Sequence, residues 1–131
     1  MIHMIVTSHG GMAEGMMQSV EMLLGEQKEV ECVSLAPDMG ADELNEVFAE
    51  KLKNVSEKDE YLILCDLRGG TPFNVVSRYS FKNEHIAVMY GMNLPMLIAA
   101  LMERQGEGQT VQELAASILK QLKETMGLSE L

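Results

Sequence analysis

Residues 61–72 read YLILCDLRGGTP, a short apolar run that ends at Asp66 and passes through two glycines into Thr71 and Pro72. Short apolar runs bounded by turn residues are typical of buried strands, and proline is favoured in the first turn of a helix. We therefore predict a strand over Tyr61–Cys65, a glycine turn, and a helix with Thr71 as its N-cap and Pro72 at its first position. A strand that runs directly into a helix is the repeating unit of an α/β fold.

The N-terminus repeats this arrangement, since residues 2–11 read IHMIVTSHGG and a helical pattern follows. Here the strand tip carries His9, which is followed by Gly10 and Gly11. Each of the two segments thus places one titratable side chain beside glycines that let backbone amides approach a ligand.

Beyond these two segments, short apolar runs alternate with amphipathic helical patterns along the chain. Strands are expected at about Ile2–Thr7, Val30–Leu35, Tyr61–Cys65 and Ile86–Tyr90. Helices are expected over about Met12–Leu24 and Asp42–Lys53, from Pro72, from near Pro95, and after a capping box of Thr110 and Glu113. The residues expected to face inward are Met12, Met16, Val20 and Leu24 in the first helix, Leu44, Val47, Phe48 and Leu52 in the second, Val75, Val76 and Tyr79 in the third, and Leu114, Ile118 and Leu122 in the last.

This alternation predicts one doubly wound α/β domain over residues 1–131, with a four-stranded, mostly parallel sheet and helices on both faces. Right-handed crossovers leave few strand orders, and 2-1-3-4 is the natural order for a domain of this size. In that order the first and third strands are neighbours. Their carboxyl ends, which carry His9 and Asp66, therefore meet in one crevice.

The composition argues against several classes of partner. The chain has 131 residues, a formal net charge of −10 and 47% hydrophobic residues, whereas nucleic acids and anionic membranes both attract basic patches. The acidic residues form either a solvated face or a surface for a basic protein partner. No leader or membrane-spanning stretch is evident. Cys32 and Cys65 lie in predicted strands, which is typical of reduced core thiols in a cytoplasmic protein.

His9 is the candidate nucleophile, because a neutral imidazole can attack phosphorus at neutral pH. Asp66 can accept a hydrogen bond from one ring nitrogen, which fixes the tautomer, frees the other nitrogen and stabilises the charge that develops on the ring. Phosphoryl oxygens would find donors in glycine amides, in a hydroxyl and at helix N-termini. These phosphate-binding candidates are Gly10, Gly11, Gly69, Gly70 and Thr71. No cluster has metal-ligand spacing, so no metal or other cofactor is expected.

Each of these features also has a plain structural interpretation. Taken alone, His9 is typical of a loop residue, Asp66 of a cap on the following turn, and Thr71 of a helix N-cap. Only their joint placement favours a phosphate-handling site. His3 and His85 have no such setting, and we expect them to be structural or surface residues.

Four segments lie in an order that matches a known family. They read IVTSHG at residues 5–10, EMLLG at 21–25, DLRGGTPFN at 66–74 and GMNLPML at 91–97. Together they resemble the enzyme IIA component (EIIA) of the mannose family of the bacterial phosphoenolpyruvate-dependent sugar phosphotransferase system (PTS). The third segment is the most specific, and the fourth supports it independently.

The resemblance implies a cytoplasmic phosphotransferase that acts through a phosphohistidine. The phosphoacceptor falls on His9, its orienting aspartate on Asp66, and a hydroxyl near the phosphoryl group on Thr71. Such proteins accept the phosphoryl group from phospho-HPr and pass it to a IIB protein or domain, which phosphorylates sugar as a IIC/IID membrane complex imports it. Arg68 stands where some relatives carry an aromatic residue. Arg68 and Asn93 are candidates for contacts with phosphate or with a partner, and Arg68 alternatively for a solvated loop charge.

The resemblance also implies a homodimer. Family members add an antiparallel edge strand to the four-stranded sheet and exchange it between the two subunits. Here that strand would come from the tail Glu124–Leu131, which is short and weakly strand-like.

Other functions compete with sugar transport. IIA-like domains beside dihydroxyacetone kinases or within transcription regulators use phosphorylation as a signal, although this sequence shows no DNA-binding segment. A response-regulator receiver would accept phosphate on Asp66, but it needs acidic residues after the first strand, where Thr7, Ser8 and His9 stand. A flavin site needs flanking aromatic residues, and the chain has no Trp and three Tyr. The identity of the sugar is not encoded here, since sugar would meet the membrane component.

Overall fold

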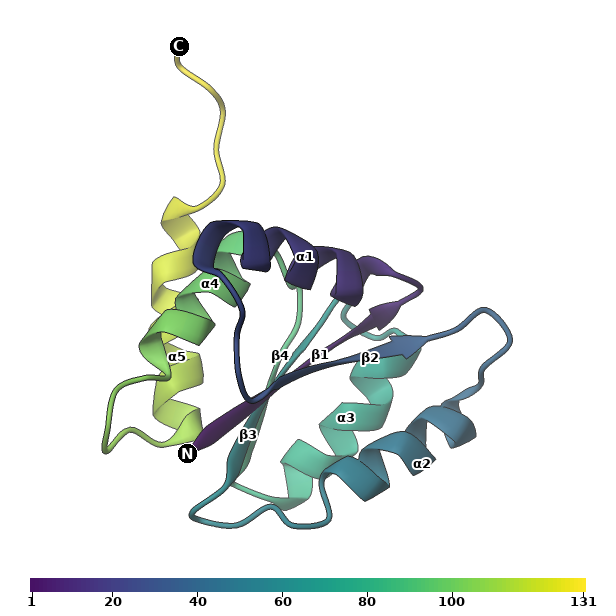
Figure 1. The fold of residues 1–131 in the computed structure, drawn as a ribbon. Helices are drawn as coiled ribbons and strands as arrows, with labels where there is room; N and C mark the ends of the chain where they lie inside the picture. The colour runs from purple at the N-terminus through teal and green to yellow at the C-terminus, as the bar shows by residue number, and fades with distance from the viewer.

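In the computed structural model, which describes residues 1–131, a four-stranded sheet lies between two layers of helices (Figure 1). The strands are β1 (Ile2–His9), β2 (Val30–Leu35), β3 (Glu60–Cys65) and β4 (Ile86–Met89). The helices are α1 (Met12–Leu24), α2 (Ala41–Lys51), α3 (Thr71–Lys82), α4 (Leu94–Glu103) and α5 (Val111–Gln121), and the 3-10 turn η1 (Leu122–Glu124) follows α5. All strand pairs are parallel, in the order β2-β1-β3-β4. The predicted fold class and strand order are confirmed.

The two central strands, β1 and β3, pair from their first residues up to the pair Thr7 and Cys65. β1 was expected to end near Thr7, but its ladder with β2 continues to the pair His9 and Leu35. The Leu35 carbonyl also accepts a hydrogen bond of 2.9 Å from the Gly10 amide. His9 is therefore the last paired residue of a central strand, and its backbone is fixed by the sheet.

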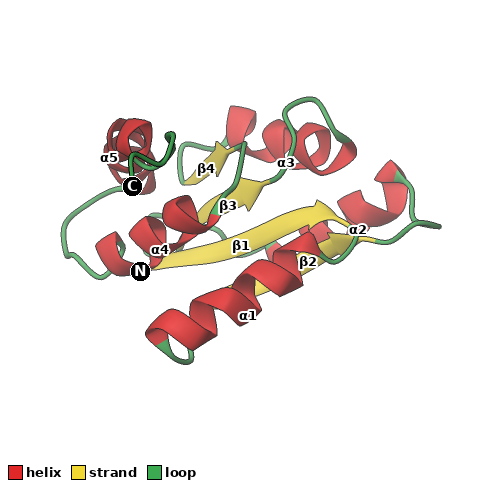
Figure 2. Cartoon of the chain, turned by 90° about the horizontal axis from the view of Figure 1, so that it is seen from above, coloured by secondary structure: helices red, strands yellow, loops and turns green.

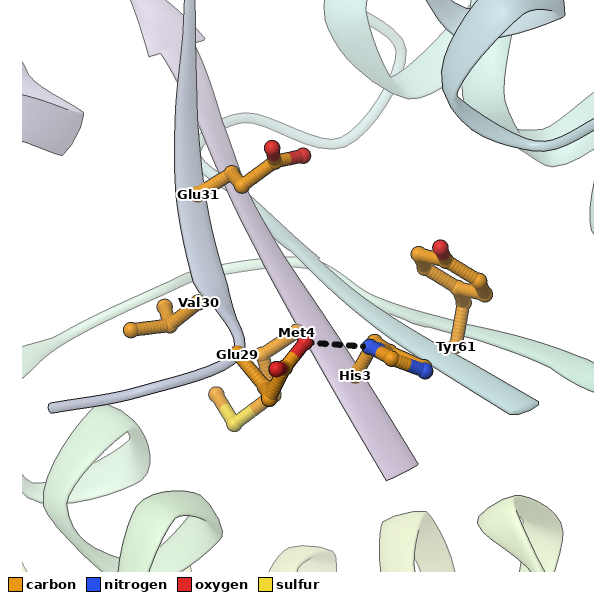
Figure 3. A pocket seen from close by; sticks show the side chains of 6 residues that line it. All are labelled: His3, Met4, Glu29, Val30, Glu31 and Tyr61. Atoms are coloured by element: carbon orange, nitrogen blue, oxygen red, sulfur yellow. Dashed lines mark hydrogen bonds and ion pairs between the residues drawn. The ribbon is translucent and has the colours of Figure 1, made fainter. Parts of the chain in front are cut away.

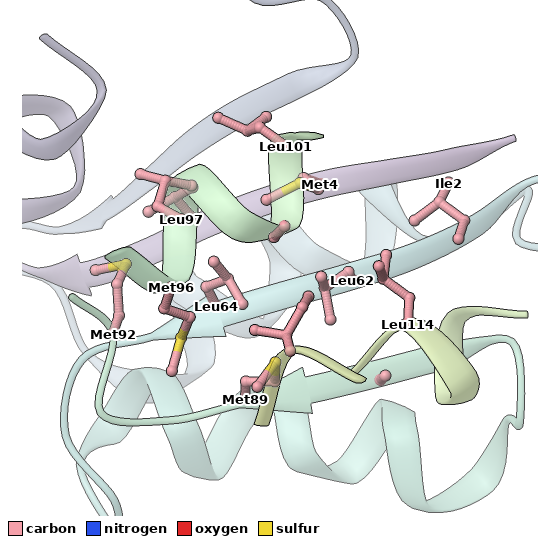
Figure 4. Close-up of a cluster of buried hydrophobic side chains, with 14 of the residues drawn as sticks. Ile2, Met4, Leu62, Leu64, Met89, Met92, Met96, Leu97, Leu101 and Leu114 are labelled. Carbon is pink, nitrogen blue, oxygen red and sulfur yellow. The ribbon is translucent and has the colours of Figure 1, made fainter. Parts of the chain in front are cut away.

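Each face of the sheet has its own apolar core. Met4, Leu62 and Leu64 point toward α1, α4 and α5 and belong to the larger core, which Figure 4 shows. Ile5 and Ile63 point to the opposite face, where α2 and α3 pack. Figure 2 shows the strands side by side with helices on both sides. Neighbouring strand residues thus alternate between two buried faces, as a covered parallel sheet requires.

The predicted inward faces are confirmed for three helices and half wrong for α1, where Val20 is buried and Met16 packs against the core but Met12 and Leu24 are exposed. In the three helices the predicted residues that are fully buried are Leu44 and Phe48 of α2, Val75 and Val76 of α3, and Leu114 and Ile118 of α5. In α1 the fully buried residues are Ala13 and Val20, with Met17 almost so. Met12 and Leu24 are instead 43% and 37% exposed. The cause is a hydrogen bond of 2.8 Å from the Ala13 amide to the Ser8 hydroxyl, which turns the Ala13 side of α1 toward β1.

The start of α3 also differs from the prediction by one position. Gly70, with an extended backbone, is the N-cap, and Pro72 lies one position further into the first turn than expected. The Gly70 carbonyl accepts the first hydrogen bond of the helix, from the Asn74 amide at 2.9 Å. As a consequence the Thr71 hydroxyl is not used as a cap. The capping box of Thr110 and Glu113 at α5 is confirmed.

The added edge strand does not form within the single chain. Residues 125–131 have no regular structure and extend away from the body of the molecule beyond η1 (Figure 1). β2 and β4 are the two edges of the sheet. No helix has both the length and the apolar character needed to cross a bilayer.

Candidate functional site

His9 and Asp66 meet at the carboxyl edge of the two central strands, as the predicted strand order requires. One carboxylate oxygen of Asp66, Oδ2, accepts a hydrogen bond of 2.8 Å from the His9 backbone amide. The same oxygen lies 2.8 Å from Nδ1 of the His9 ring. The other oxygen, Oδ1, accepts from the Leu67 amide at 2.8 Å. A carboxylate in this setting can only accept, so Nδ1 carries the proton and Nε2 keeps its lone pair.

The electrostatics of Asp66 favour its charged form. Partial burial alone would raise the pKa of Asp66, but the hydrogen bonds from the His9 amide, the His9 ring and the Leu67 amide outweigh burial and hold that pKa below its usual value. The Asp66 side chain is 11% exposed, whereas that of His9 is 49% exposed. A shielded carboxylate thus holds a ring whose free nitrogen is open to a reactant.

The turn between β3 and α3 forms a wall beside the His9 ring. A Cβ atom built at Gly70 would lie 2.7 Å from Cε1 of His9 and 3.5 Å from Nε2. The turn is closed by a hydrogen bond of 3.1 Å from the Gly70 amide to the Leu67 carbonyl. Gly69 adopts a φ of 82°, a backbone conformation that favours glycine. Both glycines of the GGTP segment are therefore needed for the shape of this wall.

The other predicted site residues lie in the loops and first helical turns that follow the strands of His9 and Asp66. Gly10 and Gly11 follow His9 directly, and Gly11 is the N-cap of α1. The Thr71 hydroxyl makes no hydrogen bond within the chain and stands in the first turn of α3. Asn93 has a structural role, since its side chain caps α4 by accepting from the Met96 amide at 2.8 Å.

Sequence reasoning missed the aromatic residues that border the site. The guanidinium of Arg68 lies over the ring of Tyr90, 5.6 Å from its centroid. Tyr90 meets the ring of Phe73 edge to face at 5.7 Å. The residue after Tyr90 is tied to the site, because the Gly91 amide donates to the Asp66 carbonyl at 2.9 Å. The signal was available, since Tyr90 follows β4 and the topology brings that end of β4 to the same edge.

The two remaining histidines lie at the opposite edge. His3 contacts Glu29 and Asp59 through its two ring nitrogens, at 2.9 and 2.8 Å, and stacks on Tyr61 at 4.8 Å. Figure 3 shows His3, Glu29 and Tyr61 around a pocket of about 280 Å³. His85 lies 3.1 Å from a carboxylate oxygen of Glu60. Each histidine ties the starts of neighbouring strands together, which fits the structural role expected for both.

The cysteines are both free thiols in strands. Cys32 lies in β2 and Cys65 in β3, next to Asp66. Burial, with a smaller contribution from the Asp66 charge, raises the pKa of Cys65 to about 12. The Cys65 thiol is therefore protonated and inert at neutral pH.

Comparison with known proteins places these features in one family. The family model described as "PTS system fructose IIA component" matches residues 3–119 of the chain. The mannose-specific EIIAB component of the PTS of Escherichia coli K12 is 37% identical over 106 residues, which is 81% of this chain and 33% of that protein. The chain thus spans about one third of the length of that relative. The fructose-specific EIIA component of Bacillus subtilis 168 is 30% identical over 80% of this chain and 72% of its own length.

A solved structure shares the fold over nearly the whole chain. The mannose/sorbose-specific IIA subunit from Enterococcus faecalis superimposes with a TM-score of 0.86 at 31% identity. The match covers 98% of this chain and 95% of that one. The similarity therefore includes both helical layers and the edge that carries His9.

Proposed function

Because this chain belongs to the EIIA mannose family of the bacterial PTS, we propose that it is a cytoplasmic phosphocarrier for sugar uptake. In this function His9 accepts a phosphoryl group from phospho-HPr and passes it to a IIB protein or domain. The IIB component then phosphorylates sugar during import by a IIC/IID complex. The observation that supports this function most directly is the double contact of Asp66 Oδ2 with the amide and with the ring of His9.

That double contact matches what phosphoryl transfer needs from a nucleophile. The lone pair of Nε2 attacks phosphorus and forms a new N–P bond, while the N–P bond to the donor imidazole breaks. The donor ring leaves with the bonding pair and becomes neutral, and the positive charge appears on the His9 ring. Asp66, 2.8 Å from Nδ1, stabilises that charge. No proton has to leave either ring in the step.

The donors around Nε2 support the same function. The amides of Gly10 and Gly70 already donate to the Leu35 and Leu67 carbonyls, which leaves the amides of Gly11 and Gly69 and the hydroxyl of Thr71 as the donors at the edge that carries His9. The N-terminus of α3 adds a partial positive charge there. We propose that these groups bind the phosphoryl oxygens, since catalysis of this transfer consists mostly of positioning and charge stabilisation.

We further propose that two copies of the chain form a homodimer. Its support lies at the C-terminus, where Met126, Leu128 and Leu131 are almost completely exposed. One side of the edge strand β4 is also unpaired. Exposed apolar side chains and an open strand edge each favour association with a second chain.

The decisive experiment is phosphoryl transfer from phospho-HPr, with the modified residue mapped by mass spectrometry under neutral or basic conditions. We expect an acid-labile, base-stable phosphate on His9 and no labelling of His9→Ala. His85→Gln is the matched control, because it removes a histidine from the opposite edge, and it should be labelled like the original protein. Labelling of His9→Ala would exclude His9 as the acceptor. Onward transfer to a IIB protein then separates a carrier for transport from a regulatory module, which would retain its phosphate.

A further inference from the structure

The loops at the carboxyl edge of the sheet contain a single basic residue, Arg68. These loops are residues 10–11, 36–40, 66–70 and 90–93. They also carry two acidic residues, Asp38 and Asp66. All other lysines and arginines lie in helices or in the turns of the opposite edge. Arg68 is therefore the one cationic side chain that the loops around His9 supply.

Arg68 has no partner of opposite charge. Its exposed side chain forms neither an ion pair nor a hydrogen bond within the chain. It is held only by its position over Tyr90, which the edge-to-face contact with Phe73 keeps in place. A cation over an exposed tyrosine contributes only about 0.5–1 kcal/mol. The N–H donors of the guanidinium are thus free. Moving the guanidinium away from the Tyr90 ring costs little free energy.

Arg68 belongs to the same turn that flanks the His9 ring. Arg68 and Gly69 are the central residues between Leu67 and Gly70, whose backbones close the turn. A Cβ atom at Gly70 would lie 3.5 Å from Nε2 of His9. Two peptide links, spanning at most about 7.6 Å, separate the Cα of Arg68 from that of Gly70. The attacking nitrogen is therefore close to the backbone that carries Arg68.

A phosphoryl group on Nε2 of His9 is stabilised by positive charge close to it. A phosphoryl group brings about two negative charges at neutral pH, and it arrives beside the Asp66 carboxylate in a chain whose net charge is already −10. The N-terminus of α3 contributes only about half a positive charge. A guanidinium forms short, charge-assisted and often bidentate hydrogen bonds to phosphoryl oxygens, which are stronger than its contact with an aromatic ring.

We propose that Arg68 is the side chain that stabilises the phosphorylated state of His9. In the unphosphorylated protein it rests over Tyr90. When Nε2 carries a phosphoryl group, the guanidinium moves to the phosphoryl oxygens, offsets their charge and slows their loss to water. Because it needs a phosphohistidine at position 9, this role rests on the function proposed above.

The test uses phosphoramidate, a small-molecule phosphoryl donor that labels histidine without a partner protein. The half-life of the phosphohistidine is then followed by ³¹P NMR at neutral pH. We expect Arg68→Gln to shorten it about tenfold, as the loss of a charge-assisted hydrogen bond would, and Arg68→Lys to restore part of it. Arg78→Gln is the matched control, since Arg78 is an exposed, unpaired arginine further along α3, and it should leave the half-life unchanged.

A second readout follows the movement itself. The Nε resonance of Arg68 should shift on phosphorylation, and the ring signals of Tyr90 should change with it. An unchanged half-life in Arg68→Gln overturns the proposed role, and a changed KM for phospho-HPr at unchanged half-life would make Arg68 a partner contact instead. If phospho-HPr does not label the original protein, the phosphocarrier function fails, yet the half-life after phosphoramidate still decides the role of Arg68.

Discussion

Asp66 combines two tasks in one oxygen atom. Oδ2 accepts from the His9 amide, which sets the position of the backbone, and from Nδ1, which sets the tautomer. In Asp66→Asn an NH₂ group must face either these two donors or the Leu67 amide. We expect phosphoryl transfer from phospho-HPr to slow by about 10²–10⁴-fold, because the proton is no longer held on Nδ1 and Nε2 loses its lone pair for part of the time.

The control for this prediction is Asp38→Asn, which removes an exposed carboxylate from another loop of the same edge. It should leave the transfer rate unchanged, and thermal unfolding of both variants should show an intact fold. A normal rate in Asp66→Asn would remove Asp66 from the mechanism. A slow rate in both variants would point to a general effect of charge rather than to tautomer control.

Substitution of Gly70 tests how strictly phosphoryl transfer depends on the position of the His9 ring. A methyl group at this position would meet Cε1 of His9 at 2.7 Å, a distance at which the half-exposed ring has to move. We expect Gly70→Ala to slow transfer by about 10²-fold, since small displacements of a reacting group have effects of this size. Gly15→Ala, at a helical glycine of α1 with open space around it, is the control. Equal transfer rates in the two variants would show that the turn between β3 and α3 does not position the His9 ring.

At the scale of elements, the sequence predicts the features that follow from local patterns or from general rules of strand connection. The alternation of apolar runs and helices, together with the handedness of crossovers, predicts the strand order, and this order places His9 next to Asp66, as the structure confirms. Thr110 was recognised as a cap because the box with Glu113 is a local pattern. The sequence pattern ends β1 near Thr7, whereas the strand continues to His9, because the Gly10 amide bonds to the Leu35 carbonyl of another strand.

The errors share one physical reason, which is that tertiary contacts decide between nearly equal local choices. A helix through Met12–Leu24 has two adjacent apolar stripes, and the hydroxyl of Ser8 selects the one with Ala13. Thr71 and Gly70 compete for the N-cap, and the close approach of Gly70 to His9 favours the glycine. The contact of Arg68 with Tyr90 joins two loops, so that the strand order, and no pattern within either loop, indicates it.

At the scale of the whole molecule, the two edges of the sheet differ in chemistry. The amino edge carries His3 with two carboxylates and His85 with Glu60. The loops of the carboxyl edge carry only Asp38 and Arg68 as charged residues besides Asp66, and they expose Leu67 and Tyr90 beside His9. The acidic residues near this edge stand in the first turns of α1 and α2. Apolar and aromatic side chains with one arginine are typical of protein interfaces. In the proposed function, a phosphoryl donor or acceptor would therefore meet Leu67, Tyr90 and Arg68 around His9.

The C-terminal tail should affect assembly and leave the stability of the single chain unchanged. Residues 125–131 form no helix or strand, and their apolar side chains lie outside both cores. Removing them should therefore leave the unfolding temperature of the monomer unchanged, while a dimer joined through the tail should dissociate. Size-exclusion chromatography with light scattering measures both species. Met22→Ser, which removes an equally exposed apolar side chain from α1, should stay dimeric. A truncated chain that remains a dimer would place the interface elsewhere, and a full chain that is monomeric at micromolar concentration would contradict the homodimer.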